Sequence, residues 1–421
     1  MYMNLRNEKA ALPSDLKFGN RIQVLEAVRD GGICCANDIS ASVSLSRQTV
    51  MKAIQFFLNN GILVSAGKGD STTSGGKRPE RYMLSPNKYF LCLTLWPQDL
   101  CLHLFTIGKT LVDSLCLAHT PALNPEAAID SIARLVDLML EKNKVSKDDI
   151  CAVSLSTSGI VDRHTGHLKY NSQAPGWGTD IPLEQYLQRH FPEDTPIFVE
   201  NAGKMTARPY LLNRNLANKR ILVILSGWGL SSCLIEKRHI LSGRNSLIGE
   251  IGHMVIDPSD TEDCGCGGRG CLERLVSIDR LRKHIAALQN EYPRSTLLHG
   301  PIDSLTMPEV FAASSAGDPL ANRLVLYIAE RFALALRNIS LVFDPDLVVF
   351  QGDYAYADGL FDQELRRQLS SFRYYSTGTP FDIKYDRRSL LDLDAEGSYI
   401  ALAELFFSSP ALYREPADAE A

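Results

Sequence analysis

The sequence lacks any apolar run long enough to cross a bilayer, and residues 1–6 lack the apolar segment of a secretory signal peptide. Neither sign of charge dominates, because the sequence has 44 Lys and Arg residues and 49 Asp and Glu residues. The apolar content of 45% is ordinary, and a chain of 421 residues is too long for a single hydrophobic core. We therefore expect a cytoplasmic protein with more than one core and no membrane partner.

Charge is distributed unevenly along the chain. Residues 1–85 hold eleven Lys and Arg against seven Asp and Glu, whereas the remainder holds 33 against 42. A small basic segment on an acidic body is typical of a nucleic-acid-binding module joined to a small-molecule-binding domain.

Three short helical patterns occupy the basic segment. Apolar residues recur at helical spacing within 18–29, a second helix is expected over 38–43, and Ser46 is a suitable N-cap for a third. Such a helix-turn-helix places the start of its last helix in the major groove of DNA. The predicted DNA contacts are Ser46, Arg47, Gln48, Thr49 and Lys52. The alternative is a three-helix protein-binding module.

Two strand patterns, at 62–64 and 81–84, flank a segment rich in Gly, Ser, Thr and Lys. This is the pattern of a winged helix, whose loop reaches DNA phosphates or a minor groove. Lys77 and Arg78 lie at the tip of the loop and are predicted to contact DNA. Residues 1–85 are therefore predicted to form a winged helix-turn-helix domain for double-stranded operator DNA.

The ten cysteines fall into two groups. Seven are scattered among apolar or helical segments, which predicts free buried thiols in a reducing cytoplasm; they are Cys34, Cys35, Cys92, Cys101, Cys116, Cys151 and Cys233.

The other three, Cys264, Cys266 and Cys271, lie within eight positions, and His253 lies eleven residues ahead of the first. Thiolates and imidazole are preferred zinc ligands, and four of them close a tetrahedron with no position left for water. Interleaved glycines permit a tight loop around an ion and argue against three unrelated buried thiols. A structural Zn²⁺ is the predicted cofactor.

The segments Gly249–His253 and Cys264–Glu273 resemble the ROK family, named for repressor, open reading frame and kinase. That family contains bacterial sugar kinases and sugar-responsive transcription repressors, and its repressors carry a winged-helix head that its kinases lack. The resemblance implies an actin-like body of two lobes over roughly 88–410, with the sugar in a cleft. It assigns zinc to the His and three Cys named above. The implied effector-binding residues are Asn171, Asn201, Glu250, His253 and Glu273.

Four kinase elements of that family are altered here. Trp96 and Pro97 stand where the first glycine-rich phosphate turn is expected, and Pro97 removes a backbone donor. Ala202 replaces the carboxylate that would accept the proton of a sugar hydroxyl. The second phosphate turn carries the bulky Trp228. Gln351-Gly352-Asp353 keeps only one of the two consecutive glycines that the family has late in its sequence. These changes predict that the body is not an enzyme, although Glu200 or Asp162 is an alternative base.

Strand-like runs at 90–95, 100–105, 150–156, 197–200, 221–225 and 347–350 alternate with helical patterns such as 127–141 and 318–341. This alternation predicts an α/β body over 86–421. Lobe one is expected at about 86–200 with a C-terminal helix at about 396–410, and lobe two at about 201–395 with the zinc loop.

The sequence favours a sugar-sensing transcriptional repressor that binds as a homodimer or homotetramer. An active sugar kinase with an added DNA-binding head is one alternative. A constitutive DNA-binding protein with a vestigial pocket is the other.

Overall fold

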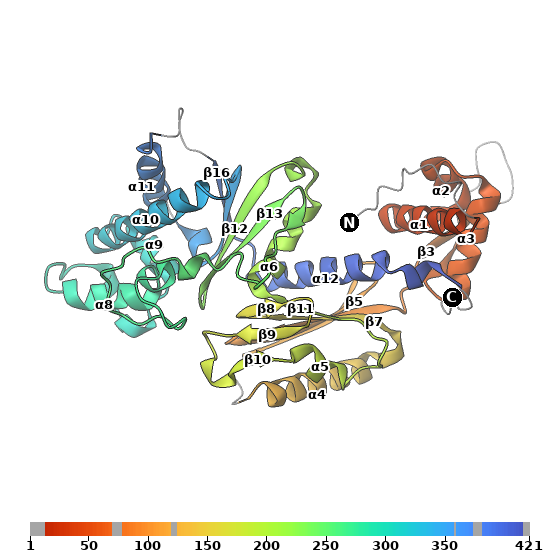
Figure 1. Cartoon of the computed structure of the whole chain (residues 1–421), viewed down its shortest axis with the longest axis horizontal. Coiled ribbons are helices and arrows are strands. Elements are labelled where there is room, and N and C mark those ends of the chain that lie inside the picture. The colour runs from red at the N-terminus through yellow and green to blue at the C-terminus, as the bar shows by residue number, and fades with distance from the viewer. Residues whose placement is uncertain (1–12, 70–77, 119–123, 358, 374–380, 416–421) are drawn as a thin grey trace.

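The computed structural model describes residues 13–69, 78–118, 124–357, 359–373 and 381–415. Figure 1 shows a small head beside a larger body of two lobes. The head consists of α1 (Pro13–Gly31), β1 (Cys34–Cys35), α2 (Ala36–Val43), α3 (Arg47–Asn59), β2 (Leu63–Lys68) and β3 (Glu80–Leu84). Its three strands form one antiparallel sheet in the order β1-β3-β2.

The helix-turn-helix of the head forms as the sequence predicts. Ser46 caps α3, because its Oγ accepts a hydrogen bond from the Thr49 backbone N at 3.1 Å. Ser44 ends α2 in the left-handed conformation, with φ of 56°, and so makes the turn tight. The apolar face of α3, with Val50, Ile54 and Phe57, is buried.

The two lobes repeat one strand topology. In each five-stranded sheet, the first three strands along the chain are antiparallel neighbours and the last two run parallel to the first. The spatial orders are β11-β7-β4-β5-β6 and β14-β13-β12-β15-β16. The strands of the first sheet are β4 (Tyr89–Leu95), β5 (Asp99–Thr106), β6 (Leu111–Ala118), β7 (Ile150–Thr157) and β11 (Ile197–Asn201). Those of the second are β12 (Arg220–Ser226), β13 (Leu230–Glu236), β14 (His239–Ile240), β15 (Leu347–Gly352) and β16 (Asp382–Asp386).

Helices cover these sheets, and apolar residues of helices and strands together form the cores of the two lobes. On the first lobe they are α4 (Pro125–Asn143) and α5 (Leu183–Gln188), beside a small sheet of β8 (Ile160–Asp162), β9 (His167–Tyr170) and β10 (Thr179–Ile181). On the second they are α7 (Leu272–Leu275), α8 (Ile278–Leu288), α9 (Met307–Ser315), α10 (Pro319–Ser340) and α11 (Gly359–Ser370). The predicted α/β alternation with an actin-like two-lobed body is confirmed.

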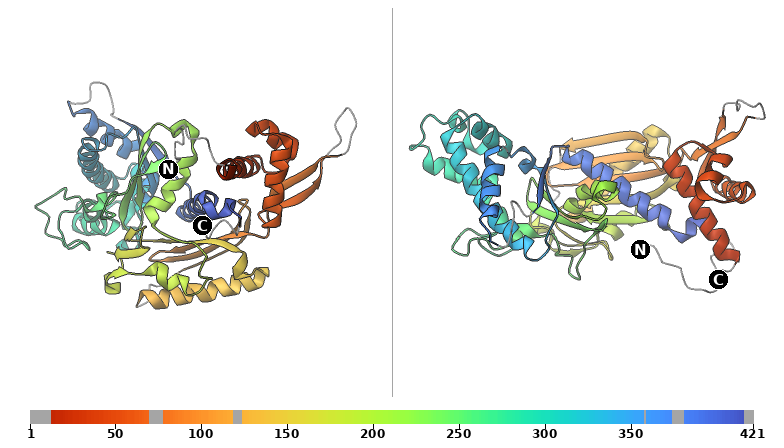
Figure 2. Two further views of the ribbon diagram at one scale, coloured as in Figure 1. Left: turned by 45° about the vertical axis from the view of Figure 1, so that its right-hand side comes forward. Right: turned by 90° about the horizontal axis from the view of Figure 1, so that it is seen from above.

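Two helices lie where the lobes meet: α6 (Ala202–Ala207) and α12 (Leu390–Ser408). Helix α12 begins at Leu390, earlier than the expected residue 396. It runs from between the lobes to the head, as all three views in Figures 1 and 2 show. Apolar residues of α12, β4 and the head belong to one continuous core, so the head is packed onto the body. No described helix has the length and apolarity of a membrane span.

One cysteine prediction is wrong. Cys101 and Cys116 are joined in a disulfide rather than being free thiols. They stand directly opposite each other on the antiparallel strands β5 and β6, where side chains of paired residues come into contact. Pairing between strands was not visible in the spacing of the scattered cysteines. The other five of that group are free, as predicted.

Candidate functional site

A cleft between the lobes is the candidate site, and several sequence-predicted residues line it. It encloses about 630 Å³, open solvent included. Its walls come from the ends of β4, β7, β11 and β12 and from the segment that leads into the cysteine loop. Asn201, Glu250, His253 and Glu273 all line it. The structure therefore brings four of the five predicted effector-binding residues together.

The fifth residue, Asn171, lines a smaller adjoining cavity, which shares Trp96, Pro97, Ser158 and Gln173 with the cleft. Its Nδ2 donates to Ser158 Oγ at 2.9 Å, and its Oδ1 accepts from the Gln173 backbone N at 2.9 Å. These bonds shape the loop between the cavities and leave Asn171 only part of its hydrogen-bonding capacity for a ligand.

Asn201 is also partly engaged. Its Oδ1 caps α6 by accepting from the Gly203 backbone N at 2.8 Å, and its Nδ2 donates to Gly159 O at 2.7 Å. One Nδ2 hydrogen remains, so Asn201 can donate to a ligand but mainly positions the loops around the cleft.

The two glutamates have different surroundings. Glu273 Oε2 accepts from the Leu230 backbone N at 2.7 Å, which fixes this carboxylate against β13. Burial raises the pKa of Glu250, while the nearby His253 and Lys204 oppose the rise. Carboxylates of this kind accept hydrogen bonds from vicinal hydroxyls, which is the chemistry that a sugar requires.

The predicted metal ligands form one cluster. His253, Cys264, Cys266 and Cys271 place one ligand atom each within 4.8 Å of all the others. Cys264 Sγ lies 3.6 Å from His253 Nδ1, and Cys266 Sγ lies 3.7 Å from Cys271 Sγ. A tetrahedral zinc with Zn–S bonds of about 2.3 Å sets its sulfurs about 3.8 Å apart. The cluster therefore has the size and donor set that zinc requires.

Burial raises the pKa values of Cys264 and Cys271, and for Cys271 the neighbouring thiols raise the pKa further. A bound cation would be needed to keep these two buried thiols as thiolates.

Glycines make the metal loop possible at two close approaches. Gly270 has φ of +70°, and a Cβ there would lie 2.0 Å from Asp257 O. A Cβ on Gly252, beside His253, would lie 2.1 Å from Leu230 O. Any side chain at either position would push the loop away from the body.

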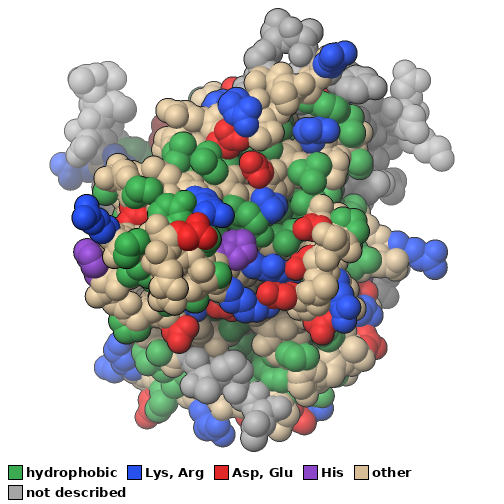
Figure 3. Space-filling view, turned by 90° about the vertical axis from the view of Figure 1, so that its left-hand side faces the viewer, with side chains coloured by type: hydrophobic (Ala, Val, Ile, Leu, Met, Phe, Trp, Pro, Cys, Tyr) green, Lys and Arg blue, Asp and Glu red, His purple; other side chains and the backbone are tan. Residues whose placement is uncertain are grey.

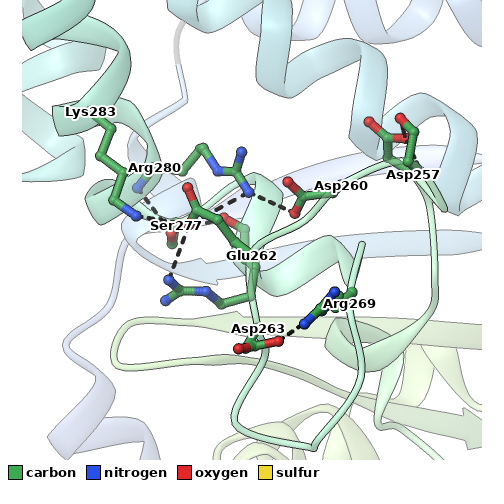
Figure 4. Close-up of polar contacts among 10 residues, drawn as sticks. Asp257, Asp260, Glu262, Asp263, Arg269, Ser277, Arg280 and Lys283 are labelled. Carbon is green, nitrogen blue, oxygen red and sulfur yellow. Dashed lines mark hydrogen bonds and ion pairs between the residues drawn. The ribbon is translucent and has the colours of Figure 1, made fainter.

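Ion pairs fasten the same loop to the second lobe (Figure 4). Asp260 binds Arg280 of α8 at 2.7 Å, and Glu262 binds Lys283 at 2.9 Å. The Asp260 and Arg280 side chains are only 8% and 12% exposed, so this pair is shielded from solvent. Since His253 also lines the cleft, the metal cluster, α8 and the cleft wall form one connected unit.

Tryptophans occupy the cleft near the altered kinase turns. The rings of Trp96 and Trp228 meet edge to face with centroids 5.4 Å apart. Trp96 is 2% exposed, and its Nε1 donates to Ser156 Oγ at 3.2 Å. Ala202 lies in the same wall. Neither Glu200 nor Asp162, the alternative bases, is among the residues that line the cleft.

Several cleft residues were not predicted from the sequence, among them Ser172, Gln173, Ser231 and Leu390. Gln173 lies two positions after the predicted residue Asn171, and this proximity along the chain was its one signal in the sequence. Leu390 had no local signal, because it reaches the cleft from α12 at the far end of the chain.

In the head, Ser46, Arg47, Gln48 and Lys52 are exposed at the start of α3, and Thr49 is half-buried. Ser46 and Thr49 also contact each other, with 2.9 Å between their hydroxyl oxygens. Arg78 is exposed beside β3, and Lys77 lies outside the described residues. The first turn of α3 carries no acidic residue.

The end of the second lobe, far from the head, carries side chains of both charges. Figure 3 views the end of the second lobe, and acidic and basic side chains alternate across it. Among the ion pairs of the second lobe, Arg323 pairs with Glu291 at 3.1 Å. The part of that face that the structure describes shows no broad patch of one charge.

Comparisons with known proteins agree with this geometry. A xylose repressor from Caldicellulosiruptor bescii is 23% identical over 363 residues, covering 84% of this chain and 88% of its own. A glucokinase from Halalkalibacterium halodurans is 28% identical over 250 residues, covering 58% of this chain and 73% of its own. The crystal structure of a ROK family transcriptional regulator shares the fold, with a TM-score of 0.73 and 17% identity over 93% of this chain and 99% of that one.

The repressor and the solved regulator match a larger share of this chain than the glucokinase does. The ROK family profile itself matches residues 102–388, which is more than half of the chain. This protein therefore belongs to the ROK family.

Proposed function

We propose that the protein is a DNA-binding transcriptional repressor of sugar metabolism whose cleft senses a sugar or sugar derivative. The observation that carries this proposal is a helix-turn-helix head packed onto a ROK body whose cleft retains carboxylates for hydroxyl groups. Residues 1–85 would bind operator DNA, and residues 86–421 would hold the effector, a structural Zn²⁺ and the oligomer contacts. A homodimer or homotetramer would supply two heads for a two-fold operator.

The proposal is tested by thermal unfolding of the full chain with a panel of sugars, amino sugars and sugar phosphates, with and without MgATP. A ligand at 100 times its Kd stabilises the folded state by about 2.7 kcal/mol. Stabilisation by one sugar, unchanged by MgATP, is expected for an effector-sensing repressor. Absence of any shift, together with operator binding, would favour the constitutive DNA-binding alternative.

Arg47→Ala is expected to weaken binding to the selected operator by about 1–3 kcal/mol if Arg47 contacts a base edge. Its exposed side chain at the start of α3 is placed for such a contact. Fluorescence anisotropy with the operator and with an unrelated duplex measures the effect. Gln55→Ala, exposed further along α3, is the control. Equal losses on both duplexes would make Arg47 a phosphate contact instead.

We further propose that the body does not phosphorylate sugars. Trp96 and Trp228 lie at the two turns that phosphates would approach, and Ala202 offers no carboxylate. Ala202→Asp alone is therefore expected to leave sugar-dependent ADP release undetectable, because the phosphate site stays filled. The wild-type chain assayed with each sugar is the reference. Sugar-dependent turnover by either protein would support the active-kinase alternative.

A further inference from the structure

A buried hydrogen-bonded chain connects the cleft to α12. Trp96, in the cleft wall, donates from Nε1 to Ser156 Oγ at 3.2 Å. Ser156 Oγ donates in turn to Asp394 Oδ1 at 2.5 Å, and Thr94 Oγ1 donates to Asp394 Oδ2 at 2.6 Å. Asp394 belongs to α12 and is 0% exposed, while Ser156 and Thr94 are at most 1% exposed. A shift of the Trp96 ring would therefore move Ser156, whose hydroxyl is bonded to the Asp394 carboxylate of α12.

The start of α12 also contacts the second lobe. Leu390 lines the cleft, and its Cδ1 lies 3.2 Å from the Cβ position of Gly352, in the late glycine turn. Further along, a Cβ on Gly397 would lie 1.9 Å from Met205 O, so α12 and α6 touch backbone to backbone. Helix α6 starts at Ala202 in the cleft wall. Through Leu390 and α6, α12 therefore contacts both sides of the cleft.

The other end of α12 is fixed to the head. After the helix, Tyr413 is 2% exposed and packs edge-on against Phe18 of α1 and Phe57 of α3, at 5.7 Å and 6.0 Å between ring centroids. Its hydroxyl donates to Phe407 O at 2.7 Å, which ties the segment back to α12. Arg21 of α1 donates to Tyr413 O at 2.6 Å. Phe57 lies on the helix that is proposed to enter the major groove.

A 19-residue helix spans about 28 Å at 1.5 Å per residue. Helices of this length move as rigid bodies more readily than they bend. A small displacement at Asp394 would therefore reach the C-terminal end of α12, where Phe407 O accepts the hydrogen bond from the Tyr413 hydroxyl.

We propose that Asp394 is the positioning residue through which the state of the cleft reaches the DNA-binding head. This inference rests on the proposed function, which requires the two sites to communicate. Occupation of the cleft moves Trp96, the hydrogen bonds through Ser156 shift Asp394, and α12 changes the position of α3. Coupling of this kind is reciprocal, so DNA on the head must alter the cleft as well.

Reciprocity allows a test that needs no identified effector. The chain has three tryptophans, and Trp96, Trp177 and Trp228 all line the cleft or its adjoining cavity. The head has none, so tryptophan emission reports the cleft while DNA binds elsewhere. The probe is a duplex selected by the full-length, metal-loaded chain from a random-sequence pool. Its binding is followed independently by anisotropy of a label on the DNA.

The wild type is expected to change its emission with the same midpoint as duplex binding. Asp394→Ala should bind the duplex but lose this emission change. Asp392→Ala, an exposed aspartate on the same helix, should retain both. Asp394→Asn should recover part of the change, because its amide oxygen still accepts one hydroxyl. If Asp394→Ala does not fold, Ser156→Ala removes the link to Trp96 while leaving the bond from Thr94.

Two results would overturn the inference while leaving the repressor proposal intact. One is duplex binding by the wild type with no change in emission. The other is an unaltered emission change in a folded Asp394→Ala or Ser156→Ala variant, which would reduce Asp394 to a structural brace. If no duplex is selected, the proposed function fails and this inference fails with it.

Discussion

Cys266→Ser is expected to release the metal and to lower the thermal stability of the body by several kcal/mol. A neutral hydroxyl is a poor zinc ligand, and structural zinc contributes about 10–16 kcal/mol to the folding of zinc-finger peptides. The body has its own apolar cores, so a smaller loss is expected here than complete unfolding. Zinc content by atomic emission and the midpoint of thermal unfolding measure the two effects.

The location of Cys266 makes this experiment easy to interpret. Its side chain is exposed, so serine leaves no cavity in a core and any large loss must come from the ligand set. Cys151 is a free thiol on β7 outside the cluster, so Cys151→Ser is the matched control. The Cys151→Ser protein should retain zinc at the cluster. Wild-type stability in a Cys266→Ser protein without metal would refute a structural role for zinc.

Zinc loss is also expected to affect the cleft. His253 belongs to both the metal cluster and the cleft wall, and Glu273 follows Cys271 by two residues. A released loop would therefore let two proposed effector contacts move. A zinc ion with four protein ligands would act on ligand binding through position alone, since it would have no coordination site left for a sugar.

The metal cluster was predictable from the sequence because its ligands are close along the chain. The interval from His253 to Cys271 is short, and glycines at its turns restrict how it can fold. The helix-turn-helix was predictable for the same reason, since Ser46 and the apolar spacing of α3 are local signals.

Contacts between distant segments were not predictable in this way. Thr94 and Asp394 are 300 positions apart, and Arg21 and Tyr413 are 392 apart. Nothing in the residues around Asp394 distinguishes it from a solvent-exposed acid such as Asp392 on the same helix. The disulfide between Cys101 and Cys116 likewise depends on strand register, which the spacing of two cysteines does not reveal.

Tyr413→Ala is expected to cost about 3–5 kcal/mol, the range for removing a buried aromatic side chain. The loss should fall on the contact between head and body, because the ring packs against Phe18 and Phe57 and lies in the core that the head shares with α12. Hydrogen exchange of the amides in α1 and α3 should therefore accelerate far more than exchange in the β4–β7 sheet.

Two control variants distinguish the effect of losing the Tyr413 ring from that of losing its hydroxyl and from that of losing any tyrosine. Tyr413→Phe keeps the ring contacts and loses the bond to Phe407 O, so a cost of about 1 kcal/mol is expected. Tyr356→Ala removes a tyrosine that is 45% exposed and should leave exchange in the head unchanged. If Tyr413→Ala binds the selected duplex with wild-type affinity while exchange in the head accelerates, the head recognises DNA without being held by the body.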